Sequence, residues 1–240
     1  MRIFIFLLLF ATLCSSCWDL QIGTPVQGIA PGTWRGAFML ENHAVPIMYE
    51  VLNTSNDKPI EVIFKTGKEE LKADRVKIWG DTVTLFFDKT NTHLKLVYQI
   101  DQMDGFLYNN DNDNYPIVFA GQHAIMHRFP VVRKKPKADL TGDWTVTANV
   151  GQDSTVTGNI RFSTDENYIE GKLTLANQKV LTLEGAVQDD KIYLSGFDGK
   201  RVCWLSATIA DSKSLVEGSI IINEENYFWE GNAVAGVIHH

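Results

Sequence analysis

The chain has 240 residues, of which 45% are hydrophobic, and this is enough apolar material for one large core or for two domains of about 100 residues each. The same apolar content excludes extended disorder. The formal net charge is −7, and the one basic run, Arg133–Lys137, is short and interrupted by proline, so the sequence predicts no nucleic-acid partner.

The chain begins with a segment typical of a secretory signal. Residues 1–16 combine one cation, Arg2, with an apolar run that is shorter than the ~20 residues needed for a membrane-spanning helix. Ser15, Ser16 and Cys17 follow, an arrangement that resembles a bacterial lipobox, although Cys14 stands where a lipobox usually has leucine. The resemblance implies a lipid on Cys17, and a folded part held in the cell envelope outside the cytoplasm, in the periplasm or at the outer membrane.

Two other interpretations of this segment stay open, a redox pair and an ordinary cleaved signal. Cys14 and Cys17 have CxxC spacing, but a catalytic CxxC normally lies at a helix start on a βαβ scaffold, and the sequence before Cys14 is too short to form one. The third cysteine, Cys203, lies in the apolar stretch "KRVCWLSATI" and is expected to be a buried, unreactive thiol.

The rest of the chain consists of two halves that repeat one another. The openings "PGTWRG" and "TGDWTV" place Trp34 and Trp144 at equivalent points, and "GDTVTLFFD" in the first half corresponds to "DDKIYLSGFD" in the second. The stretch between the halves, "HRFPVVRKKPKADL", contains two prolines and several cations and is expected to be exposed. We therefore predict a tether over 17–31, domains over 32–130 and 140–236, a linker over 131–139 and a tail over 237–240.

Apolar and polar residues alternate within each half, as Val83, Leu85 and Phe87 illustrate, and this alternation predicts strands with one buried face. Turn signals divide each half into about eight segments. Their centres are Phe38, Ile47, Ile63, Val76, Leu85, Leu96, Leu107 and Val118 in the first half, and Val146, Ile160, Leu173, Leu183, Tyr193, Leu205, Ile220 and Phe228 in the second.

A meander of eight strands removes its exposed edges most simply by closing. We therefore predict an all-β protein with two tandem antiparallel meander barrels, or curled sheets, that are lipocalin-like and have about eight strands each. A barrel of this size is either filled by side chains or holds one small ligand.

Motifs that carry chemistry are scarce. Asn109–Tyr115 has the composition of a calcium loop but lacks its glycine and its glutamate, so a hairpin loop is expected. His123 and His127 have HxxxH spacing without a helix cap and are not expected to bind a metal. "GFDG", residues 196–199, predicts a tight turn in which Asp198 accepts backbone hydrogen bonds. The sequence predicts no catalytic residues, no metal and no cofactor.

The tryptophans fall into two groups. Trp34 and Trp144 recur at equivalent positions, as core residues at the opening of each barrel would. Trp79, Trp204 and Trp229 are open to two interpretations, either core residues or parts of a surface for a ligand or a partner.

On "PGTWRG", "GDTVTLFFD", "TGDWTV", "YLSGFDG" and "EGSI", the chain resembles the N-terminal β-rich region of Gram-negative TlpA-like lipoproteins. In those proteins this region leads into a thioredoxin-like domain with W-C-x-x-C, a motif absent from this sequence. The resemblance implies a non-enzymatic module, naturally short or truncated, that is accessory to a thiol-disulfide oxidoreductase system or docks a protein with a thioredoxin fold. The alternative is a carrier of a small hydrophobic ligand in a lipocalin-like barrel.

Overall fold

The computed structural model describes residues 29–52, 58–130, 134–150, 154–176 and 178–234. The predicted signal segment, Cys17 and the tail therefore lie outside the described residues. Within the described ranges, no helix is long and apolar enough to cross a membrane.

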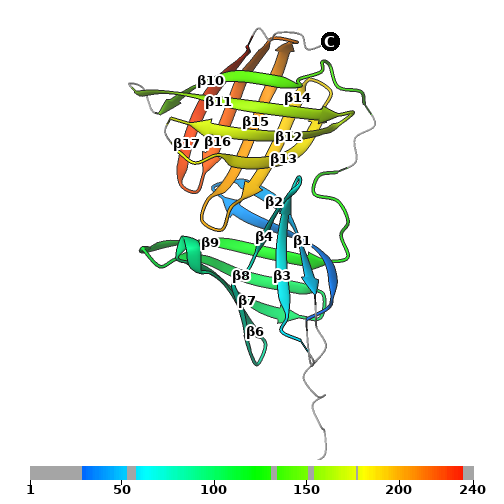
Figure 1. The fold of residues 1–240 in the computed structure, drawn as a ribbon, viewed down its shortest axis with the longest axis vertical. Helices are drawn as coiled ribbons and strands as arrows, with labels where there is room; N and C mark the ends of the chain where they lie inside the picture. The colour runs from blue at the N-terminus through cyan, green and yellow to red at the C-terminus, as the bar shows by residue number, and fades with distance from the viewer. Residues whose placement is uncertain (1–28, 53–57, 131–133, 151–153, 177, 235–240) are drawn as a thin grey trace, which may run out of the picture.

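The first unit is a nine-stranded antiparallel sheet that curls into a half-barrel (Figure 1). In space its strands follow the order β4-β3-β2-β1-β9-β8-β7-β6-β5, so β1 pairs with β9 while β4 and β5 form the two edges. A single 3-10 turn, η1 (Asp88–Thr90), follows β6. The strands are β1 (Gly32–Leu40), β2 (His43–Leu52), β3 (Glu61–Thr66), β4 (Glu69–Lys72), β5 (Arg75–Trp79), β6 (Thr82–Phe87), β7 (Thr92–Gln99), β8 (Gln102–Asn109) and β9 (Asn112–His123).

The second unit is a closed barrel of eight antiparallel strands in sequential order. The pairing of β10 with β17, from Trp144 opposite Ala233 to Asn149 opposite Phe228, closes it. This arrangement confirms the all-β class and the predicted eight-stranded meander barrel. The strands are β10 (Gly142–Val150), β11 (Ser154–Asp165), β12 (Tyr168–Leu175), β13 (Leu181–Gln188), β14 (Lys191–Phe197), β15 (Val202–Asp211), β16 (Ser214–Ile222) and β17 (Glu225–Ala233).

The first unit takes the second of the two predicted forms, a curled sheet, and does not close into a barrel. All sixteen predicted segment centres lie in strands, but the structure adds a short charged strand, β4, that alternation did not indicate. Only Ala73 and Asp74 join β4 to β5, and their N–H groups donate in opposite directions, Ala73 to Val62 on β3 and Asp74 to Phe86 on β6. The two strands therefore diverge, and the sheet stays open at this seam.

The two units begin with the same local structure, as the sequence repeat predicted. Gly32 and Gly142 take positive φ angles of 110° and 132°, which glycine adopts without strain. Two residues later, Trp34 and Trp144 are 0% and 2% exposed, and each indole N–H donates to the carbonyl four residues earlier at 2.9 Å. The expectation that both tryptophans are core residues is confirmed.

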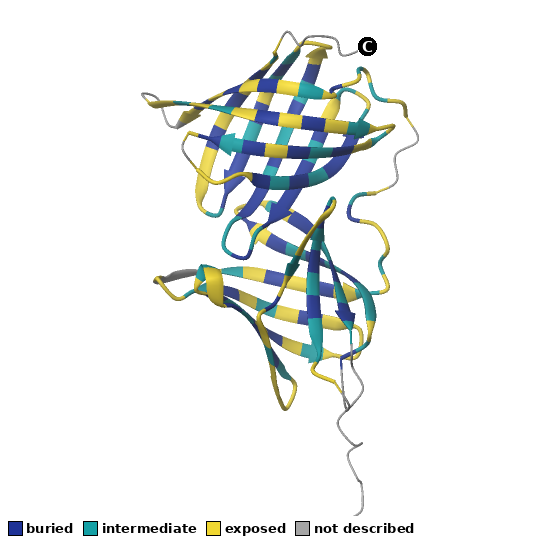
Figure 2. Cartoon of the chain, in the orientation of Figure 1, coloured by how far each residue is buried: buried dark blue, intermediate teal, exposed yellow. Residues whose placement is uncertain are grey.

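The interior of the second barrel is filled by side chains. Buried and exposed residues alternate along its strands, as Figure 2 shows, so one face of every strand contributes to the core. The buried cluster comprises Leu140, Trp144, Val146, Ala148, Ile160, Phe162, Ile169, Leu173, Leu175, Leu181, Leu183, Val187, Ile192, Leu194, Cys203, Leu205, Ala207, Ile209, Leu215, Ile220, Ile222, Tyr227 and Trp229.

The core of the first unit is completed by residues of the second. The turn between β14 and β15, Phe197–Val202, which we call the junction hairpin, reaches the open half-barrel. Phe197 lies with its ring centroid 4.9 Å from that of Phe38, 5.3 Å from that of Phe64 and 5.4 Å from that of Phe87. Val202 is also buried in this first-unit cluster. The half-barrel therefore buries its apolar face against the second barrel.

Candidate functional site

The segment between the two units contributes a buried cation to their junction. Arg128 is only 5% exposed, which corrects the expectation that this proline- and cation-containing stretch is fully exposed. Its Nη1 donates to Ser195 O at 3.1 Å, and its Nη2 donates to Lys65 O and lies 3.3 Å from a carboxylate oxygen of Glu184. Burial lowers the pKa of Arg128, and the Glu184 carboxylate opposes that shift. The guanidinium thus links strands of both units.

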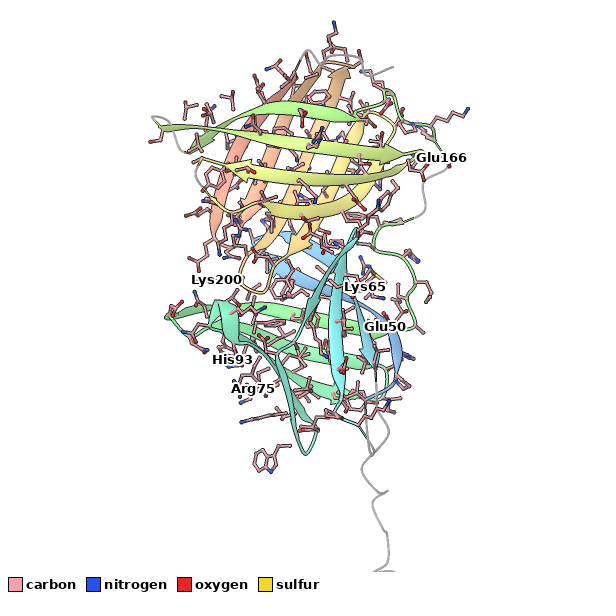
Figure 3. All side chains as sticks on the ribbon, viewed as in Figure 1. Glu50, Lys65, Arg75, His93, Glu166 and Lys200 are labelled. Carbon is pink, nitrogen blue, oxygen red and sulfur yellow. The ribbon has the colours of Figure 1, made fainter. Side chains whose placement is uncertain are left out.

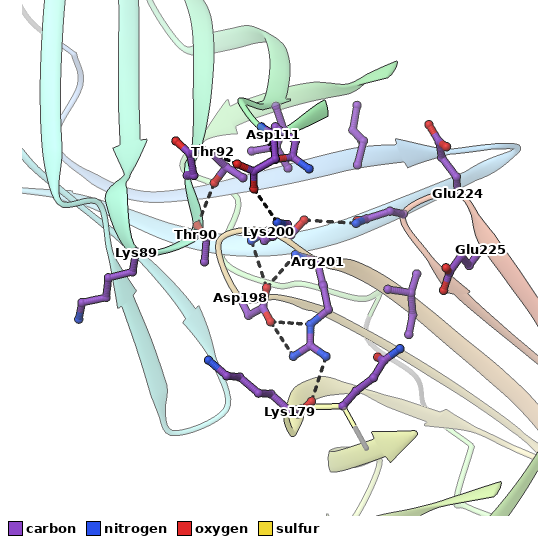
Figure 4. A pocket seen from close by; sticks show the side chains of 17 residues that line it. Lys89, Thr90, Thr92, Asp111, Lys179, Asp198, Lys200, Arg201, Glu224 and Glu225 are labelled. Atoms are coloured by element: carbon purple, nitrogen blue, oxygen red, sulfur yellow. Dashed lines mark hydrogen bonds and ion pairs between the residues drawn. The ribbon is translucent and has the colours of Figure 1, made fainter. Parts of the chain in front are cut away.

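Beside this junction is a cleft of about 690 Å³, the junction cleft. Its walls come from η1 and the turn after it, the β8–β9 hairpin, the β12–β13 loop, the junction hairpin and the β16–β17 turn (Figure 4). The lining residues are Lys89, Thr90, Asn91, Thr92, Leu107, Asn109, Asp111, Ile117, Gln178, Lys179, Asp198, Lys200, Arg201, Ile222, Asn223, Glu224 and Glu225.

The junction hairpin forms one wall of the cleft, and side-chain hydrogen bonds fix its shape. The Asp198 carboxylate accepts the backbone N–H groups of Lys200 at 3.1 Å and Arg201 at 2.7 Å, which confirms the predicted turn. Gly199 has φ +96°, and its carbonyl accepts hydrogen bonds from the hydroxyl groups of Thr90 and Thr92. The hairpin is therefore held both within itself and to the first unit.

Charged groups of both signs line the junction cleft. Lys200, at the boundary between the units (Figure 3), lies 3.0 Å from the Asp111 carboxylate of the first unit. Hydrogen bonds from Asn91 and then from Lys200 lower the pKa of Asp111. Lys179 and Glu224 are exposed on the second-unit side of the cleft. A wall with paired and free charges suits a polar partner surface and not a purely apolar ligand.

Histidine, cysteine and acidic side chains are the groups that could hold a metal ion or act as nucleophiles. No cluster of three or more histidine, cysteine or acidic residues that could hold a metal ion occurs in the part of the chain that the structure describes. Cys203 is completely buried, as expected, and burial raises the pKa of its thiol, which keeps it in the less nucleophilic thiol form. The His123 side chain lies with Nε2 3.0 Å from Pro31 O, where it supports the start of β1.

The structure separates the three tryptophans proposed for a surface. Trp79, at the end of β5, is 88% exposed. Trp204 lies at the junction, with its ring centroid 5.8 Å from those of His43 and Tyr193. Trp229 is 2% exposed, and its indole N–H donates to a carbonyl of β15 at 3.0 Å inside the second barrel. The interpretation of Trp229 as part of a partner surface is therefore wrong, because the alternation of buried and exposed residues along β17 places the Trp229 side chain in the core.

A second hollow, of about 570 Å³, lies on the outer face of β7, β8 and β9. Val97, Phe106 and Val118 line it and are each at least 40% exposed. Neither hollow was found by sequence reasoning. The junction cleft is built from five separate chain connections, so no single stretch of sequence indicates it. The exposed apolar residues of the outer face cannot be distinguished in the sequence from ordinary strand residues.

The comparisons with known proteins find no family. No protein-family model matches the chain, and no curated protein matches it. Among solved structures, a tryptophan-to-alanine mutant of the vaccine antigen transferrin binding protein B from Haemophilus parasuis Hp5 is similar, with 9% identity and a TM-score of 0.26. The match covers 85% of this chain and 45% of that one, so the chain spans less than half the length of that protein.

Proposed function

We propose that this chain is a non-catalytic binding module of the cell envelope, attached by a lipid on Cys17, whose partner docks at the junction cleft. The observation that carries the proposal is the combination of a filled second barrel with a cleft whose walls come from both units. Such a molecule offers a preformed polar surface, since the junction hairpin is tied to both units before a partner arrives.

The filled interior favours this function over that of a ligand carrier. A carrier needs a cavity of about 300 Å³ or more, and the positions that would line one in the second barrel hold Trp144, Phe162 and Trp229, each at most 2% exposed. Extraction of the purified protein with organic solvent, followed by mass spectrometry, tests the alternative. We expect no reproducible small molecule, and a stoichiometric lipid or other apolar compound would establish the carrier instead.

The first partner to test is a protein with a thioredoxin fold, which the resemblance to TlpA-like lipoproteins suggests. A photo-crosslinking residue placed at Lys179 or at Glu224 lies on the junction cleft, whereas one placed at exposed Arg161, on β11 of the second barrel, serves as the control. In envelope preparations, we expect one dominant adduct from both cleft positions that the control lacks. Equal labelling from Arg161, or adducts of no consistent mass, would remove the cleft from the proposal.

The non-enzymatic part of the proposal has its own test. A thiol-disulfide exchange assay is expected to give the same background rate for the chain and for Cys203→Ser, because this buried thiol is not exposed to a substrate. Turnover that depends on Cys203 would show that the protein is an oxidoreductase.

The lipid anchor is tested by labelling cells with a palmitate analogue. We expect the wild-type chain to incorporate the label and Cys17→Ala to remain unlabelled. Incorporation that persists in Cys17→Ala would place the acyl chain elsewhere.

A further inference from the structure

One end of the first sheet carries both the start of the described chain and two exposed hairpin ends. His123 Nε2 lies 3.0 Å from Pro31 O, just before β1, and the His123 N–H donates to Asp101 O at 2.8 Å in the β7–β8 turn. The N–H of Tyr98 donates to Asp81 O at 2.8 Å, so the β5–β6 turn lies beside the same place. Figure 1 shows the β5–β6 hairpin extending toward the end of the molecule opposite the second barrel.

These two turns expose large apolar side chains. Trp79 is 88% exposed, Ile100 is 70% exposed and Ile78 is 46% exposed. Gly80 completes the first turn with φ +62°, and a Cβ added there would meet no atom within 4 Å, so this turn projects freely. Exposed apolar residues scattered singly need no explanation, but three of them at one end of a sheet point to a contact.

The backbone at Ile100 gives an independent indication. Ile100 has φ +45°, in the left-handed region where a β-branched residue is strained and where hairpin turns favour asparagine or glycine. The turn itself gains nothing from isoleucine, and the side chain is not buried in the protein. A strained residue with an exposed apolar side chain indicates a role outside the fold.

We propose that the exposed ends of the β5–β6 and β7–β8 hairpins, with Trp79 and Ile100 as the main contacts, rest in the interface of the bilayer to which the chain is anchored. This inference depends on the lipid at Cys17 proposed above. Ile29 is twelve positions after Cys17, and a chain of that length reaches about 40 Å even when fully extended, so the anchor keeps this end of the sheet close to the bilayer. Tryptophan is the side chain most typical of a membrane–water interface, since its ring is apolar and its N–H is polar.

The charges at this end specify the kind of bilayer surface. Asp81 and Asp101 lie in the two turns and are both exposed, so the turns themselves offer no cation to anionic headgroups. The contact is therefore apolar, favours zwitterionic lipids such as phosphatidylethanolamine, and changes little with salt. In this orientation the junction cleft, whose walls include the opposite ends of β7 and β8 and turns of the second barrel, lies away from the membrane.

The test uses the lipidated full chain in phosphatidylethanolamine–phosphatidylcholine vesicles that contain brominated acyl chains, which quench nearby tryptophan fluorescence. We expect the quenched fraction to fall in Trp79→Phe. In the matched control Phe228→Trp, which adds an indole at a 70% exposed site on β17 of the second barrel, the new fluorescence is expected to escape quenching. Quenching that is unchanged in Trp79→Phe, or equal at the Phe228→Trp site, would overturn the proposed contact.

A second measurement separates this contact from the anchor. With the unlipidated chain Cys17→Ala, we expect weak binding to the same vesicles that drops by about tenfold or more in Trp79→Ser and again in Ile100→Asn. Thermal unfolding of both variants verifies that they fold. If the palmitate analogue labels Cys17 but these substitutions leave vesicle binding unchanged, the anchor stands and the hairpin contact is wrong. If Cys17 takes no label, the anchor in the proposed function fails instead.

Discussion

Replacement of Phe197 by alanine tests whether the second barrel completes the core of the first unit. The side chain is 5% exposed and lies against Phe38, Phe64 and Phe87, all of the first unit, with ring centroids 4.9 to 5.4 Å away. Truncation of a buried phenylalanine costs about 3–5 kcal/mol through lost burial and the cavity that remains. Because a typical domain is stable by only about 5–15 kcal/mol, we expect a large shift of the guanidinium midpoint.

The strands that lose stability in Phe197→Ala show whether the first unit has lost part of its core or whether only the second barrel is damaged. Hydrogen exchange is expected to accelerate in β1, β3 and β6 of the first unit, which carry the three phenylalanines, although Phe197 belongs to β14 of the second. Phe228→Ala is the matched control, because this 70% exposed phenylalanine should change the free energy of unfolding by no more than about 0.5 kcal/mol. A loss below about 1 kcal/mol for Phe197→Ala, or faster exchange confined to the second barrel, would refute the reasoning.

Three other results are expected. Arg128→Met should lower the free energy of unfolding by about 3–5 kcal/mol, since it leaves carbonyl and carboxylate groups at the junction without their donor. The control Arg161→Met, at a site where the arginine side chain is 72% exposed, should lower it by at most about 1 kcal/mol. Urea denaturation compares the two variants, and equal losses would contradict the bridging role of Arg128. Cys203, in a chain whose other cysteines are serine, should react with Ellman's reagent only on denaturation, and rapid labelling of the native protein would show that the thiol is exposed. Because the pKa of Asp111 is lowered by Asn91 and Lys200, its contribution to stability is present above its usual pKa of about 4 and is lost as the pH falls through the lower folded value. The stability difference between wild type and Asp111→Asn should therefore vanish in acid, and a difference that grows there would have the wrong sign.

The strands could be predicted because their pattern is local. Alternation places Val83, Leu85 and Phe87 on one face whatever they pack against, and the repeated glycine and tryptophan at the start of each unit mark equivalent positions. Whether a sheet closes into a barrel cannot be predicted locally. The same alternation of apolar and polar residues occurs when the apolar face is buried inside its own barrel and when a neighbouring unit covers it. Phe197 illustrates this, since the sequence indicated only a tight turn at residues 196–199, and the three phenylalanines that bury it lie in another part of the chain.

The candidate site was hidden from sequence reasoning for the same reason. The polar residues of the junction cleft are ordinary turn residues, and they form a site only because the junction hairpin brings Lys200 to Asp111 of the first unit. Since Phe197 and Arg128 tie the units together beneath that hairpin, the cleft exists before any partner arrives, and a partner need not supply the free energy of assembling it. A first unit separated from the second would lose both the wall of the cleft and part of its own core. The two units therefore depend on one another, and we expect that division of the chain near residue 135 would not yield two halves that keep the cleft.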